Sequence, residues 1–301
     1  MHSGWGQHAR ANFASLVSVY GQSVGVVRLE LMDNAKESEI GVAKRLLEVV
    51  TSTPTLAQSL PLSFSLDALP TQVETLDLLE ARHCHYLVSL KANQKKLYDQ
   101  MRSLLHHATP LSQTTHTETL HGQQTQRTVQ VYHVPDDLPQ RWAKAGITRI
   151  VWVIRQGTRA GKPFAEEQCY LSNLCLDATI FLDLTRSHWQ IENGLHWVKD
   201  VTLQEDDPPR RGGYAPISWA IFNSVSDYLS PSFRVPNDPR LHPRTRQSGA
   251  SGFSLANLKP PCPSAKKGGF VLLIFNLAMS YFCGRLPSNY LRRCHVSHLS
   301  S

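Results

Sequence analysis

Two acidic residues, Asp67 and Glu192, occupy positions that suggest a chemical function for their carboxylates. Asp67 ends the apolar run Leu62-Ser-Phe-Ser-Leu, which is predicted to be a buried strand. In such surroundings a carboxylate is costly unless it is paired with a cationic group or binds a metal ion. Glu192 lies in the most distinctive stretch of the chain, residues 186–206, which contains two His-Trp pairs. The first chemistry to consider is therefore a cation held by carboxylates.

The stretch around Glu192 places four polar residues close to one face of a predicted helix. His188, Glu192, His196 and Lys199 follow one another at helical spacing, and residues three or four apart lie on the same side of a helix. The apolar residues between them point elsewhere, toward a core. A solvated face carrying surface ion pairs is the plain alternative to a functional one, and the spacing alone leaves both open.

A zinc-dependent hydrolase is a second functional alternative for the same helix. The series His188-x3-Glu192-x3-His196 would offer three ligands on one face. Zinc sites of this kind usually recruit a further ligand from another element, and no second cluster of ligands is evident in the sequence. A stoichiometric zinc ion that is lost on His188→Ala would favour this alternative.

The elements that must position these residues alternate between strand and helix over the first hundred residues. Apolar runs, a hairpin signal at Gly21-Gln-Ser and a helical stripe after Glu39 set their order, and Pro70 suits the first turn of the helix that follows it. The alternation indicates the α/β class, with parallel strands in one sheet. The predicted strands are residues 13–20, 24–31, 62–69 and 85–90, and the predicted helices are residues 39–50, 70–82 and 95–107.

Four segments follow from shifts in composition along the chain. Thr, Gln and His crowd residues 113–128, and short alternating runs follow, so an antiparallel β insert is predicted there. A long helical pattern then begins at Asp177 and continues to about Leu203. The segments are 1–109, the first part of the core; 110–170, the β insert; 171–229, the helix with Glu192; and 230–301, a basic Pro/Ser-rich tail.

Composition excludes several classes of protein. The chain has 301 residues, of which 41% are hydrophobic and 18% charged, values that fit neither a disordered nor a collagen-like chain. No apolar run reaches the roughly 18 residues that a membrane span needs, and the first residues do not resemble a signal peptide. Six scattered cysteines favour reduced thiols. We expect a soluble protein of the cytoplasm.

The net charge of +7 comes from the tail alone. Residues 230–301 hold ten Lys or Arg against one acid, Asp238, so residues 1–229 carry a net charge of −2. Bulk charge is therefore no argument that the folded part binds DNA. The tail also lacks glutamate altogether, which predicts either a disordered basic extension or sequence that is out of frame.

Three blocks of residues, in order, resemble the DDE transposases of bacterial insertion sequences. They are Phe64-Ser-Leu-Asp67-Ala-Leu, His85-Tyr-Leu-Val-Ser-Leu-Lys91-Ala-Asn93-Gln94, and Arg186-Ser-His188-Trp-x-Ile-Glu192-Asn-x-Leu-His196-Trp followed by Asp200 and Glu205-Asp206. The subgroup that the chain resembles is that of the H-repeat-associated proteins, within the group that carries a β insert. Lys36-Glu-Ser-Glu39-Ile is also similar to this family. The resemblance covers about residues 12–229.

This resemblance implies an RNase-H-like mixed sheet with flanking helices and metal-assisted DNA cleavage and strand transfer. Two divalent cations, Mg²⁺ or Mn²⁺, would be held by two Asp and one Glu. By matching position, Asp67 and Glu192 are two of these catalytic and metal-binding residues. Lys199, Lys91 and His188 would contact DNA. The implied partners are double-stranded DNA (transposon ends and target) and, as a further assembly, a homodimer, with no membrane partner; the implied place is the bacterial nucleoid within the cytoplasm.

The chain departs from the family at its start. The first catalytic Asp of such proteins lies on a first strand, which comes before the strand that matches residues 13–20. In this chain only twelve residues precede residue 13. We therefore expect the first strand to be missing and the chain to be an inactive fragment. The alternative is a non-catalytic remnant that binds DNA through phosphate contacts, steeply dependent on salt.

Overall fold

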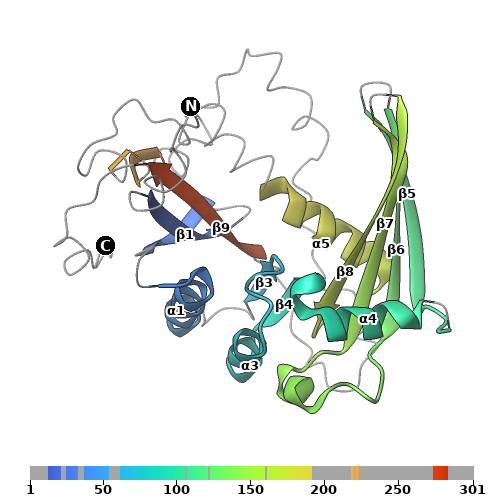
Figure 1. Ribbon diagram of the computed structural model, residues 1–301, viewed down its shortest axis with the longest axis horizontal. Helices are drawn as coiled ribbons and strands as arrows, with labels where there is room; N and C mark the ends of the chain where they lie inside the picture. Colours follow the sequence, from blue (N-terminus) through green and yellow to red (C-terminus); the bar gives the residue numbers. More distant parts are fainter. Residues whose placement is uncertain are drawn as a thin grey trace, which may run out of the picture.

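One sheet of nine strands organises the molecule (Figure 1). The computed structural model describes residues 13–21, 25–32, 37–53, 62–105, 107–120, 123–159, 161–191, 218–219, 221–223 and 274–283. In these residues the strand order is β2-β1-β9-β3-β4-β8-β7-β6-β5. The mixed α/β class predicted from the sequence is confirmed. The strands are β1 (Phe13–Gly21), β2 (Gly25–Met32), β3 (Ser63–Leu66), β4 (His85–Leu90), β5 (Ser112–Leu120), β6 (Gln123–His133), β7 (Arg149–Arg159), β8 (Lys162–Ser172) and β9 (Ile274–Cys283).

The first part of the chain forms the predicted hairpin and helix. β1 and β2 pair antiparallel, and α1 (Glu39–Ser52) follows. The side chain of Ser38 caps this helix by accepting a hydrogen bond from the Gly41 amide at 3.2 Å, which satisfies one of the free donors of the first turn. The apolar stripe of α1 is buried, as its spacing predicts.

A short parallel pair lies at the centre of the sheet. β3 and β4 pair parallel, joined by α3 (Val73–Ala81), and all four residues of β3 are buried. The expectation that Pro70 lies in the first turn of this helix is wrong. The backbone turns first, with the Gln72 amide bonded to the Pro70 carbonyl at 2.8 Å, and the helix begins three residues later.

The predicted antiparallel β insert is present and is longer than the apolar runs indicate. β5 to β8 pair antiparallel in sequence order, and β8 joins β4 of the central pair. The edge strand β5 consists mainly of Thr, Gln, His and Glu, so hydrophobic alternation could not reveal it. The four segment boundaries given above remain predictions.

Two hydrophobic cores cover the two faces of the sheet. One contains side chains of α1, α3, α4 (Lys95–Leu104) and the short helix η3 (Gln140–Ala145), with the fully buried Trp142 and Trp152. The other lies beneath α5 (Ala178–Ile191), whose Phe181 belongs to the same buried cluster as Val129 and Val153 of the insert. α5 is thereby fixed between the insert and the central strands.

One strand from the predicted tail lies inside the sheet. β9 pairs antiparallel with β1 and parallel with β3, so it joins the N-terminal hairpin to the rest of the sheet. The remaining residues of 230–301 lie outside the described part of the chain. Among the residues that are described, none of the helices is long and apolar enough to cross a membrane.

Candidate functional site

Asp67 lies directly after β3, at the edge of the central parallel pair. Its side chain is 59% exposed, and Oδ1 accepts a hydrogen bond from Nζ of Lys91 at 3.0 Å. The apolar strand before it suggested buried surroundings, whereas the side chain of Asp67 is exposed although Ala68 and Thr71 after it are buried. Because carboxyl ends of parallel strands meet at one edge of a sheet, Asp67 and Lys91, which follow β3 and β4, lie side by side there.

The surroundings of Asp67 favour its ionised form. Partial burial opposes ionisation, but the hydrogen bond from Lys91, the Ala68 amide and the positive charges of Lys91 and His188 together outweigh it and hold the pKa of Asp67 below its usual value. The Asp67 carboxylate at the end of β3 is therefore held in its ionised form.

Two short segments brace this carboxylate, and we call them the Asp67 loop (residues 67–72) and the Lys91 turn (residues 91–94). Thr71 donates from Oγ1 to the carbonyls of Asp67 at 3.0 Å and Ser89 at 2.9 Å. Asn93 donates from Nδ2 to the Ala68 carbonyl at 2.6 Å. The family-like residues Lys91-Ala-Asn-Gln therefore have a structural function, since they fix the backbone that carries Asp67.

A second carboxylate near Asp67 was not singled out as a site residue from the sequence. Glu39, the first residue of α1, has its pKa raised by burial and by the negative charge of Asp67. The segment Lys36-Glu-Ser-Glu39-Ile resembles the family, but this resemblance assigns no function to Glu39. The signal that could have found it is the capped helix start at Ser38, which fixes Glu39 in the first turn.

His188 connects α5 to the strand that carries Asp67. Its Nδ1 lies 2.6 Å from Oγ of Ser65, and its ring stands edge-on to Tyr170 with centroids 6.3 Å apart. Ser65 is two residues before Asp67 and is 3% exposed. The structure thus brings together Asp67, Lys91 and His188, three of the five residues that the sequence analysis selected.

The other two selected residues, Glu192 and Lys199, lie outside the described residues, as does His196. The zinc alternative, which needs Glu192 and His196, therefore remains a prediction. Over the residues that are described, no group of three or more His, Cys, Asp or Glu could hold a metal ion.

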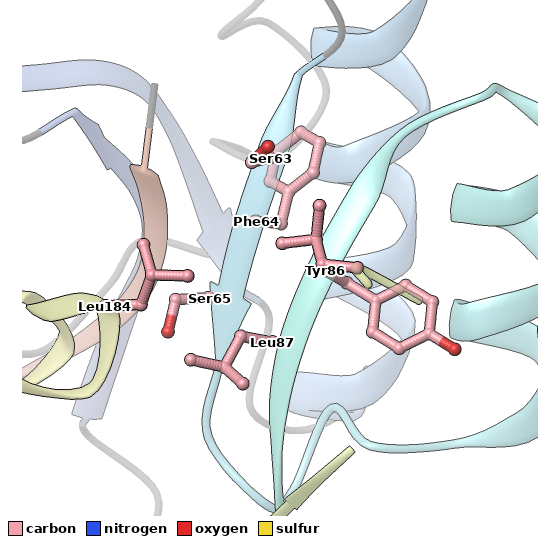
Figure 2. A pocket seen from close by; sticks show the side chains of 7 residues that line it. Ser63, Phe64, Ser65, Tyr86, Leu87 and Leu184 are labelled. Carbon is pink, nitrogen blue, oxygen red and sulfur yellow. The ribbon is translucent and has the colours of Figure 1, made fainter. Parts of the chain in front are cut away.

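A small cavity beneath α5 adjoins the site (Figure 2). Its volume is about 10 Å³, about enough for one water molecule. Figure 2 shows Leu184 of α5 facing Ser65 and Leu87, while the ring of Tyr86 points away to the other side of the sheet. Among the described residues, the buried hydroxyl of Ser63 has no hydrogen-bond partner. This space is a packing feature beneath the helix and is too small to bind a substrate.

The family that matches this chain, and two of the known proteins that match it, are described as transposases. Residues 2–212 match the family described as "Transposase DDE domain". "Putative transposase YncI" of Escherichia coli O157:H7 is 27% identical over 212 residues, which are 66% of this chain and 52% of that protein. "H repeat-associated putative transposase YhhI" of Escherichia coli strain K12 is 26% identical over 184 residues, 55% of this chain and 47% of that protein. The chain spans about half the length of the curated relatives it matches.

Proposed function

This chain belongs to the DDE transposase family, in its H-repeat-associated kind, and we propose that it forms the RNase-H-like catalytic core of such an enzyme. The proposed reaction is cleavage and joining of DNA strands at a site built on Asp67. A parallel central pair with a carboxylate at its end, flanked by helices and extended by an antiparallel insert, supports this proposal.

The contact between His188 and Ser65 carries the proposal. It fixes α5 on the strand that ends at Asp67, and Glu192 follows His188 by four residues, which is one turn where helical spacing continues. We therefore propose that Glu192 and Asp67 act at the same site, with Glu39 as a third carboxylate near it.

The donor groups present fit a hard divalent cation. Carboxylate oxygens are the ligands that Mg²⁺ and Mn²⁺ prefer. The negative charge of Asp67 adds to the effect of burial in raising the pKa of Glu39, which supports the choice of Glu39 as a further ligand. Asp67, Glu39 and Glu192 would hold the ion. When bound, such an ion activates the attacking hydroxyl and stabilises the leaving oxygen in phosphoryl transfer.

The residues of the chain have separate functions in this proposal. Lys91 holds Asp67 in place through the 3.0 Å contact and would turn to a DNA phosphate when a cation replaces it beside the carboxylate. Lys199 and His188 remain proposed DNA contacts, the latter in addition to docking α5. DNA is the proposed partner, with a homodimer as a further proposed assembly.

A non-catalytic DNA-binding function is the second candidate. The observation that favours it is the pair of Lys91 and Asp67, because the ammonium group already neutralises the carboxylate that the cation needs. On this basis we propose that the chain alone binds the cation weakly and cuts DNA slowly or not at all, while phosphate contacts still bind duplex DNA.

Metal binding and DNA binding should be measured separately. We expect Mn²⁺ binding, followed by electron paramagnetic resonance, to be lost in Asp67→Asn and retained in Asp99→Asn, which changes an exposed carboxylate on α4. Duplex binding should persist in both variants. Plasmid nicking with Mn²⁺ distinguishes the catalytic from the non-catalytic candidate. Equal Mn²⁺ binding by the wild type and Asp67→Asn would contradict the proposed site.

A further inference from the structure

A row of charged residues crosses the β insert, strand by strand. His116 of β5 is in register with Arg127 of β6, Arg127 with Arg155 of β7, and Arg155 with Glu166 of β8. Residues that pair directly across neighbouring strands share a face of the sheet. Two residues away along the strands, Val129 and Val153 are in register and belong to the core beneath α5. The charged row therefore lies on the face that α5 covers, at the border of that core.

α5 adds a third arginine to this row. Arg186 lies one turn beyond the packed residue Leu182, and its Nη2 is 3.4 Å from Oε2 of Glu118 on β5. The positive charges of Arg155 and Arg186 both lower the pKa of Arg127, after the larger effect of its burial, while Glu118 acts in the opposite direction. The guanidinium group of Arg127 is thus close enough to those of Arg155 and Arg186 to be repelled by both.

The neighbouring carboxylates relieve this repulsion at Arg127 only in part, because each is already paired with another arginine. Glu166 pairs with Arg155 at 3.3 Å and with Arg159 at 3.6 Å, and Glu118 pairs with Arg186. Within the part of the chain that the structure describes, the guanidinium group of Arg127 makes no side-chain hydrogen bond or ion pair. Like charges directly opposite each other destabilise a strand pair, so a half-buried, unpaired arginine opposite another arginine is a costly arrangement for a stretch that needs only to fold.

We propose that Arg127, Arg155 and Arg186 form a binding site for a phosphate group of a DNA strand. The inference rests on the proposed function, in which Glu192 follows α5 in the sequence. The DNA strand would run along α5 from this row of residues toward Glu192. A phosphate accepts paired hydrogen bonds from the planar fork of a guanidinium. Its charge would replace the repulsion around Arg127 by attraction, and the insert would hold DNA beside the site at Asp67.

The first test uses inorganic phosphate and needs no DNA and no catalytic activity. We compare the full-length protein with Arg127→Gln and with Arg102→Gln, which removes an exposed charge on α4. Phosphate should raise the melting temperature of the wild type and Arg102→Gln above the value in chloride of equal ionic strength. This difference in melting temperature between phosphate and chloride should be absent in Arg127→Gln. Without phosphate, Arg127→Gln should have a higher melting temperature than the wild type, because the repulsion is removed. An equal phosphate effect in all three proteins would overturn the site.

The second test identifies the source of the phosphate. Binding of a fluorescent duplex is titrated over a range of salt concentrations, where each lost phosphate contact lowers the slope of log affinity against log salt by about 1. We expect that loss, with affinity weakened about tenfold at fixed salt, in Arg127→Gln and not in Arg102→Gln. An unchanged slope in Arg127→Gln with an intact phosphate effect would overturn DNA as the ligand. The Asp67→Asn variant should keep the wild-type slope, so a failure of the cation site is seen separately.

Discussion

The imidazole of His188 and the hydroxyl of Ser65 lie 2.6 Å apart, although 123 positions separate them in the chain. Ser65 is buried in the middle of β3, whereas His188 is near the end of α5. Its ring also meets Tyr170 edge-on. This single contact therefore links α5, which precedes Glu192 in the sequence, to the strand that precedes Asp67.

Removing the hydroxyl of Ser65 should loosen α5 from the sheet. Ser65→Ala leaves Nδ1 of His188 without this partner in a half-buried place, and such a loss costs about 1 kcal/mol or somewhat more. We expect the free energy of unfolding in urea to fall by that amount and deuterium uptake to rise in α5. Ser103→Ala, which removes an exposed hydroxyl from α4, is the control.

A double-mutant cycle tests whether the effect belongs to this contact. Ser65→Ala and His188→Ala together should cost clearly less than the sum of the two single changes, because either one already breaks the hydrogen bond. Additive losses would show that the two side chains act independently in solution.

The ammonium group of Lys91 should control the ionisation of Asp67. Its hydrogen bond and charge help to lower that pKa against the effect of burial, so Lys91→Met should raise the pKa of Asp67, measured by NMR titration of the carboxyl carbon. A carboxyl with a lowered pKa in the folded state stabilises the protein above its unfolded pKa, and the contribution is lost as pH falls through the folded value. The stability gap between wild type and Lys91→Met should therefore be largest near neutral pH and shrink below about pH 4.

Lys96→Met serves as the matched control, since it removes an exposed lysine from α4. A pKa of Asp67 that is the same in wild type and Lys91→Met would mean that the 3.0 Å pair is not formed in solution.

Local chemistry made part of the site predictable from the sequence. An acidic residue at the end of an apolar strand marks a strand end whatever the surrounding fold, so Asp67 could be selected without coordinates. The Lys91 turn was found by resemblance alone, because its function is to hold the Asp67 loop through the hydrogen bond from Asn93 to the Ala68 carbonyl. A bond to a backbone 25 residues away leaves no periodic signal.

Contacts between distant segments explain what sequence reasoning missed. Glu39 starts an ordinary amphipathic helix, and only the tertiary fold brings it within electrostatic range of Asp67. β5 lacks apolar alternation because its side chains are largely solvated along the edge of the sheet. The strand β9 lies in residues 230–301, a segment that the sequence analysis described only by its composition. Composition does not indicate which strands a segment pairs with.

Glu39 should respond to Asp67 in a way that NMR can follow. Burial and the charge of Asp67 raise the pKa of Glu39, so Asp67→Asn should lower it toward its usual value, whereas Asp99→Asn should leave it unchanged. A carboxyl whose pKa is raised by folding makes stability fall as pH rises through the interval between its unfolded and folded values. Glu39→Gln should therefore be modestly more stable than the wild type at neutral pH, with the difference gone below about pH 4. If Asp67→Asn leaves the pKa of Glu39 raised, burial alone is the cause.

The position of β9 between β1 and β3 makes the sheet depend on residues 274–283. Ala278 pairs with Ser18 of β1, two residues beyond the last residue of β9 that pairs with β3. Proline at that position removes an amide donor from a strand inside the sheet, which central strands do not tolerate. We expect Ala278→Pro to lower the free energy of unfolding by about 2 kcal/mol or more. Deuterium uptake should rise in β1, β2 and β3 and stay unchanged in β5 to β8, because those strands pair with one another and join the centre through β4.

Ala278→Ser keeps the amide and separates the effect of the backbone from that of the side chain. It should leave deuterium uptake in β1 and β3 close to that of the wild type. If Ala278→Pro also leaves those two strands protected, β1 and β3 are held together without residues 274–283, and the hairpin must join the sheet through another pairing. If protection is lost from the insert as well, the nine strands unfold as one unit rather than as two parts linked by β9.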